Sequence, residues 1–100
     1  MFLEKYVSEL YFAQIIKKYS EDYLNILDEQ KFLEICALFK KYNFYFLNDI
    51  VLSYLEIFQM DVIELNKKLL KLKEIHGDYF NVIIGNDLTL LEGVLGENYD

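Results

Sequence analysis

Few residues of this chain are of the types that carry catalysis. Cys36 is its only cysteine and His76 its only histidine. No Cys–His pair stands at close spacing, and no G-x-S-x-G nucleophile turn occurs. A small enzyme would need Cys36 and His76 to meet in a cleft. We expect instead that Cys36 is a buried apolar side chain and that His76 complements the dipole at a helix end. The sequence therefore predicts no enzyme.

Metal and cofactor chemistry also lack their usual residues. One cysteine and one histidine cannot build a structural zinc site within one chain. The acids do not form the dense alternating ligand run of a calcium loop, and the four glycines form no phosphate-cradling loop. We therefore expect no metal and no cofactor.

Nucleic-acid binding would depend on lysine, because all ten basic residues are lysines and none is arginine. Their main concentration is Lys67, Lys68, Lys71 and Lys73. A net charge of −7 repels a phosphate backbone, and lysine lacks the planar fork that reads guanine. We interpret these lysines as a solvated helix face and expect no direct binding of DNA or RNA.

The acidic residues are distributed unevenly along the chain. Residues 1–73 contain 11 acids and 10 lysines, a net charge of −1, whereas residues 74–100 contain six acids and no base. Such asymmetry bears on solubility and on the choice of partner rather than on fold. It singles out the last quarter of the chain as a candidate partner-binding segment.

Tyrosines alternate with the acids in this last quarter. Carboxylates steer a protein toward a basic surface, and tyrosine rings anchor an interface at low entropic cost. Tyr23, Tyr42 and Tyr45 supply further rings of this kind. The alternative is that the rings belong to the core and the acids only promote solubility. We predict a partner-binding set of Asp78, Tyr79, Glu92, Glu97, Tyr99 and Asp100.

The elements that position these residues are predicted to be helices. Residues 2–19 have an amphipathic pattern whose apolar side rotates in the second half. Apolar residues on two sides of that half must both be buried, either by other helices of the chain or by a partner. We favour an intrachain cover. The alternative is a self-association face, and hence a homodimer, made of Tyr11, Phe12, Ile15 and Ile16.

The next helices begin at recognisable caps. Ser20 and Asp28 are typical N-caps, and they predict a short helix through residue 27 and an amphipathic one over residues 29–42. Asn43 is suited to a left-handed C-terminal position. It precedes an aromatic connection over residues 44–47.

Residues 48–60 are apolar on nearly every side of a helix, so we predict one buried central helix there, capped by Asn48. Asp61 begins an acidic capping box for a helix to residue 75, which Gly77 ends. Residues 79–84 fit either a short helix capped by Asp78 or an extended segment, and we favour the helix. A last helix runs from residue 86 or 87 through 95, and residues 97–100 are expected to be a mobile acidic tail.

These elements predict an all-α, compact single-domain bundle of five or six helices, organised as helical hairpins around the central buried one. One hundred residues suffice for one core, and no linker-like tract divides the chain. No apolar run is long enough to span a bilayer, and no signal peptide is recognisable. With a single cysteine, this favours a soluble cytoplasmic protein that does not bind membranes.

By size, acidity and helical character the chain is similar to small neutralising proteins such as toxin-immunity proteins and phage inhibitors of nucleases. The similarity is one of class and carries over no residue. It implies an inhibitor that docks on a basic surface of another protein. A self-associating helical adaptor without inhibitory activity is the alternative from a different class.

Overall fold

The computed structural model describes residues 1–95, and every regular element in that range is helical. The all-α class is therefore confirmed, and residues 79–84 are helical rather than extended. The described residues form more helices than predicted because long helices are broken. In order they are η1 (Phe2–Lys5), α1 (Glu9–Lys18), α2 (Glu21–Asn25), α3 (Glu29–Lys41), α4 (Leu47–Ser53), η2 (Leu55–Gln59), α5 (Val62–His76), α6 (Phe80–Asn86), η3 (Leu88–Leu91) and α7 (Glu92–Leu95), where η denotes a 3-10 helix.

Local capping chemistry sets most of the helix starts. The side chains of Ser20, Asp28 and Asp61 each accept the backbone N–H three residues later, so the predicted N-caps of α2, α3 and α5 are confirmed. Asn43 has φ 64° after α3 and Gly77 has φ 86° after α5. Both chain reversals thus use the left-handed backbone that asparagine and glycine tolerate.

The predicted single helix over residues 2–19 is wrong. A 3-10 turn ends at Lys5, and α1 begins only after Ser8, whose hydroxyl accepts the N–H of Tyr11. This break changes which face of the chain is buried and explains why the apolar pattern rotates. The signal was present in the sequence, because Ser8 followed by Glu9 is a favourable N-cap and first turn.

The predicted single helix over residues 48–60 is also wrong, although its buried character is confirmed. α4 ends at Ser53, Tyr54 leaves the helical conformation with φ −140° and ψ 54°, and a 3-10 helix follows. The break leaves backbone groups without helical partners. Lys18 Nζ donates to the carbonyl of Leu52 at 2.9 Å, and Tyr19 Oη bridges that carbonyl and the N–H of Leu55 at 3.1 and 3.2 Å.

Three other helix starts differ from the prediction. Asn48 and Asp78 are not caps, because α4 and α6 begin after Phe46 and Tyr79 without a side-chain cap. The last helix is divided into η3 and α7, and Asp87 caps η3 through the N–H of Thr89. The tail predicted over residues 97–100 lies outside the described residues.

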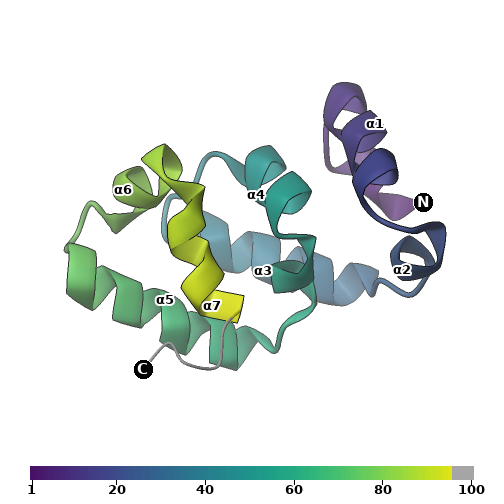
Figure 1. Ribbon diagram of the computed structural model, residues 1–100. Helices are drawn as coiled ribbons and strands as arrows, with labels where there is room; N and C mark the ends of the chain where they lie inside the picture. Colours follow the sequence, from purple (N-terminus) through teal and green to yellow (C-terminus); the bar gives the residue numbers. More distant parts are fainter. Residues whose placement is uncertain (96–100) are drawn as a thin grey trace.

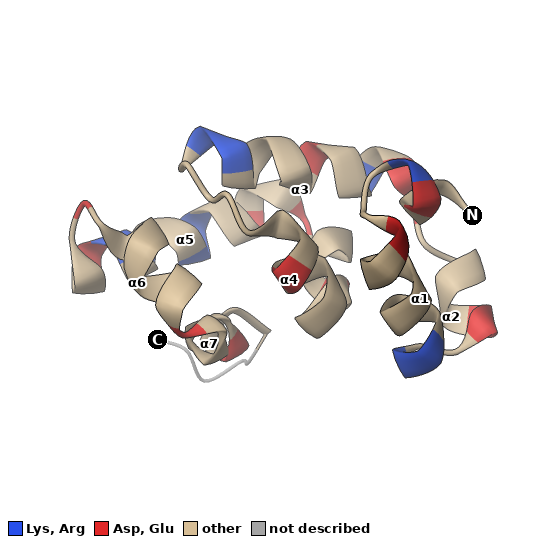
Figure 2. Cartoon of the chain, turned by 90° about the horizontal axis from the view of Figure 1, so that it is seen from above, with Lys and Arg blue, Asp and Glu red and all other residues tan. Residues whose placement is uncertain are grey.

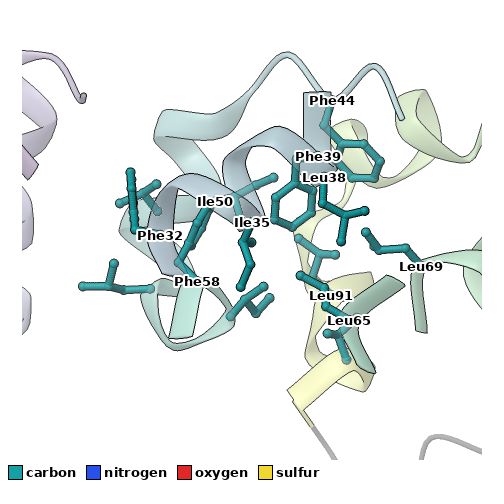
Figure 3. Packing of buried hydrophobic residues seen from close by; sticks show 14 of the residues in the cluster. Phe32, Ile35, Leu38, Phe39, Phe44, Ile50, Phe58, Leu65, Leu69 and Leu91 are labelled. Carbon is teal, nitrogen blue, oxygen red and sulfur yellow. The ribbon is translucent and has the colours of Figure 1, made fainter. Parts of the chain in front are cut away.

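α3 holds the molecule together, rather than the predicted central helix. Its apolar stripe packs against η2 on one side and α5 on the other. Figure 3 shows Phe32 and Ile35 of α3 beside Phe58 and Ile50, with Leu38 turned toward Leu69, Leu65 and Leu91. Phe58 of η2 packs against two rings of α3, with its ring centroid 5.1 Å from that of Phe32 and 5.5 Å from that of Phe39. The described helices therefore share one apolar core.

The helices are arranged along one long direction. Figure 1 shows α1 and α2 at the end that holds the N-terminus, the α5–α6 turn at the opposite end, and α7 crossing in front of α5. No charged or polar side chain is buried among the described residues. Within the same range, no helix has both the length and the apolarity needed to cross a membrane. Candidate binding groups must therefore be sought on the surface.

Candidate protein-binding site

The predicted partner-binding set is divided by the fold. Asp78 and Tyr79 lie in the turn between α5 and α6, where Tyr79 is 76% exposed. Glu92 begins α7, which Figure 1 shows crossing the molecule away from that turn. Glu97, Tyr99 and Asp100 lie outside the described residues. The three described members of the set thus belong to two separate places.

Glu92 has an aromatic partner that the sequence did not indicate. Tyr54 Oη donates a hydrogen bond to Glu92 Oε1 at 3.2 Å, which joins the α4–η2 break to α7. The pKa of Tyr54 is raised, first by burial and then by this hydrogen bond and the nearby charges of Glu92, Asp87 and Glu56. The Tyr54 hydroxyl therefore bonds to one carboxylate and lies within the electrostatic influence of two more.

Two more tyrosines continue this surface toward α2. Tyr19 and Tyr23 stack with ring centroids 5.7 Å apart, and both have raised pKa values, chiefly from burial with a further contribution from Glu56. Tyr19 also bridges the break next to Tyr54. The rings are half-buried and the carboxylates exposed. We call the set of Tyr19, Tyr23, Tyr54, Glu56, Asp87 and Glu92 the tyrosine–carboxylate surface.

The carboxylates of this surface are not neutralised by lysine. Between residues 1 and 95 the one salt bridge joins Lys5 to Glu29 at 3.1 Å. Lys18 lies at the edge of the surface, but its ammonium is bonded to backbone carbonyls. Figure 2 shows acidic segments on α4 and α7, with lysines at the ends of α1 and α3 and on α5. The surface therefore keeps a net negative charge.

The predicted self-association face is also divided. Ile15 is fully buried, and the half-buried Tyr11 donates its hydroxyl hydrogen to Asp49 Oδ1 on α4, so both residues contact the rest of the chain. The favoured intrachain explanation therefore holds for this flank of α1. Phe12 stays half-buried and Ile16 is 52% exposed. Only the flank with Phe12 and Ile16 is open to a partner.

The two residues considered for catalysis lie on different helices. Cys36 is half-buried in α3, and burial raises the pKa of its thiol to about 11. That thiol is protonated at neutral pH, which is the unreactive form. His76 is the last residue of α5. No group of three or more His, Cys, Asp or Glu side chains suited to a metal ion occurs within residues 1–95.

Sequence reasoning missed Tyr54, Glu56 and Asp87 as binding candidates. Tyr54 belongs to the stretch predicted to be one core helix, and Asp87 to a turn. Only the break at Tyr54 brings its hydroxyl to Glu92, 38 residues later in the chain. The alternation of Asp87 with Thr89 was a usable local signal for a cap. No local signal indicated that these acids surround a tyrosine.

Comparisons of this chain with family models, with curated proteins and with solved structures find no match.

Proposed function

We propose that this protein is a small acidic binding protein that docks its tyrosine–carboxylate surface on a basic surface of another protein and inhibits it. The observation that carries the proposal is the arrangement around Tyr54. Its hydroxyl donates a hydrogen bond to Glu92, and the exposed carboxylates of Glu56 and Asp87 are near enough to raise its pKa. Of the predicted docking residues, Glu92 belongs to this surface.

Each part of this surface has a physical role in docking. Unpaired carboxylates attract a basic partner from a distance and raise the association rate. Half-buried tyrosines lose little further freedom on binding because packing already holds their rings. Tyr54 and Tyr19 bear hydroxyls that are bonded within the chain, so they present pre-organised faces. The combination suits a partner rich in lysine or arginine.

A phosphate-binding enzyme, such as a nuclease, is the class of partner that fits this chemistry best. Its active-site cations would accept carboxylates in the place of phosphates. Binding there would block the substrate, which makes inhibition the expected consequence. The proposal places this activity in the cytoplasm and requires no metal or cofactor, and no direct contact with nucleic acid or membrane.

The test compares two variants of equal net charge. Glu56→Gln, Asp87→Asn and Glu92→Gln together change the net charge from −7 to −4. Glu34→Gln, Glu64→Gln and Glu74→Gln make the same change at exposed positions elsewhere. Immobilised wild-type protein and both variants capture proteins from the native host, followed by mass spectrometry and kinetic measurement with the purified partner. We expect the affinity of the first variant for the partner to fall on the order of tenfold or more, mainly through slower association. The control variant should keep the wild-type affinity.

The possible outcomes separate the parts of the proposal. Equal losses in both variants would show that overall charge, not this surface, attracts the partner. No loss in either would end electrostatic docking. If the partner is bound but its activity in a turnover assay is unchanged at saturating protein, docking stands and the inhibitory role is wrong. Circular dichroism of both variants confirms that they fold.

A further inference from the structure

An open groove with apolar and acidic walls lies around Phe12 at the N-terminal end of the molecule. It consists of two hollows that share the Phe12 ring. One hollow, of about 400 Å³, is lined by Met1, Phe12, Ile16 and Leu24 together with Glu21 and Asn25. The other, of about 460 Å³, is lined by Phe12, Glu4 and Glu9. We call these residues together the N-terminal groove.

The groove exists because α1 has apolar residues on both flanks. One flank packs on α4 through the buried Ile15 and through Tyr11. The other flank carries Phe12 and Ile16, and no described helix covers it completely, since Ile16 is 52% exposed. Such an uncovered apolar flank is typical of a surface that receives another helix.

The rim of the groove is acidic. Glu4, Glu9 and Glu21 are exposed around Phe12, and no lysine is among the described residues that line either hollow. Lys5 is paired with Glu29, and Lys17 and Lys18 line a different hollow beside Leu52. A second copy of this chain bound face to face would place acid opposite acid, because a two-fold interface pairs each patch with itself. The charge therefore argues for a basic occupant.

We propose that the N-terminal groove binds an amphipathic helix of another protein that carries lysine or arginine beside its apolar stripe. The apolar stripe fills the hollows around Phe12 and Ile16, and the flanking cations lie opposite Glu4, Glu9 and Glu21. This groove shares no residue with the tyrosine–carboxylate surface, which it adjoins on α2, and the proposal does not depend on that surface. It would give the protein a second contact that selects partners by shape as well as charge.

Two designed peptides test the proposal directly. The first is a fluorescein-labelled 14-residue helix with leucines at helical spacing and lysines elsewhere, and the second replaces each lysine by glutamate. Fluorescence anisotropy with the full chain measures binding of each. We expect one lysine peptide per chain, and an affinity for it on the order of tenfold or more above that for the glutamate peptide. Amide shift changes should centre on Phe12, Ile16 and Leu24.

Matched variants locate the binding site. Ile16→Ser should lower the affinity for the lysine peptide on the order of tenfold, which corresponds to about 1.4 kcal/mol of binding free energy. Ile63→Ser, at a 64% exposed position on α5, is its control and should change nothing. The variant with Glu56→Gln, Asp87→Asn and Glu92→Gln should also bind the peptide normally. If that variant loses the peptide while Ile16→Ser retains it, the peptide uses the other surface and the groove proposal is wrong.

Other outcomes would also overturn it. Equal affinity for the two peptides would show that the acidic rim selects nothing. Light scattering that finds a dimer in wild-type protein and a monomer in Ile16→Ser would make a second copy the occupant. Amide shift changes confined to Tyr54 and α7 would place the peptide elsewhere even if both serine variants failed to fold.

Discussion

At the scale of single residues, Tyr19 has a structural role that its sequence neighbours do not indicate. Its hydroxyl accepts the N–H of Leu55 and donates to the carbonyl of Leu52, the two backbone groups freed where α4 ends. Leu55 is fully buried, so water cannot replace this partner. One side chain just after the end of α1 thus stabilises the break beside Tyr54, whose hydroxyl bonds to Glu92.

Replacing Tyr19 by phenylalanine should therefore destabilise the protein. It leaves the buried N–H of Leu55 without a partner, and the free energy of unfolding should fall by about 1–3 kcal/mol. Urea unfolding followed by circular dichroism measures this change. Tyr45→Phe is the control, because Tyr45 is 73% exposed. Equal stability of the two variants would show that the bridge contributes nothing.

Cys36 should make stability sensitive to alkaline pH. Its pKa is raised from 9.0 to about 11 by burial, so the unfolded chain ionises first as pH rises. The free energy of unfolding is then unaffected below pH 9 and falls as pH rises toward 11. Cys36→Ala should show a shallower fall over this range in urea titrations. Identical slopes in the two proteins would contradict the assigned burial.

At the scale of elements, α6 can approach the start of α4 only because it contains Gly85. A Cβ built at this glycine would lie 2.6 Å from Phe46 Cε1. Real side chains do not approach so closely, so the ring of Phe46 occupies the space that a larger residue would need. α6 packs mainly on α5 and η3, and this contact adds a close approach to the residue that precedes α4.

Gly85→Ala and Phe46→Leu should therefore be strongly coupled. Alanine alone should destabilise through the clash by about 1–3 kcal/mol, partly offset by its better helix propensity of about 1 kcal/mol. With Phe46→Leu in place the clash is relieved, and the same alanine should be neutral or stabilising. A double-mutant cycle in urea unfolding measures the coupling. Additive effects would show that the two residues do not press on one another.

At the scale of the whole molecule, one apolar core connects the two ends. Ile15 of α1 and Leu91 of η3 are both fully buried and belong to the same cluster, which α3 bridges. A shared core is expected to unfold as one cooperative unit. The predicted single domain would likewise unfold in one cooperative transition.

Shortening a buried side chain at either end of the molecule should consequently lower the midpoint of a single, common unfolding transition. Ile15→Ala and Leu91→Ala should each reduce the free energy of unfolding by about 2–5 kcal/mol. Thermal scans followed by circular dichroism and by tyrosine fluorescence should coincide in each variant. Separate transitions, with Ile15→Ala affecting only one of them, would show that the N-terminal helices form an independent unit.

The tyrosines show which part of the candidate site could be predicted from residue types alone. Their use beside carboxylates was predicted, and Glu92 was among the residues named. Tyr79 is exposed as a docking residue requires, yet Tyr54 is the ring that bonds to Glu92. Tyr54 and Glu92 are 38 positions apart in the sequence, so no local pattern could predict that they form a hydrogen bond.

Local sequence patterns were sufficient to predict the all-α class, the caps at Ser20, Asp28 and Asp61, and the reversal at Gly77, because capping and backbone strain depend on a few neighbouring residues. The place where residues 48–60 break depends instead on contacts between segments that are distant in the chain. A chain that is apolar on all sides favours burial but does not say against what. Contacts from α1 satisfy the broken backbone, and that break creates the tyrosine–carboxylate surface.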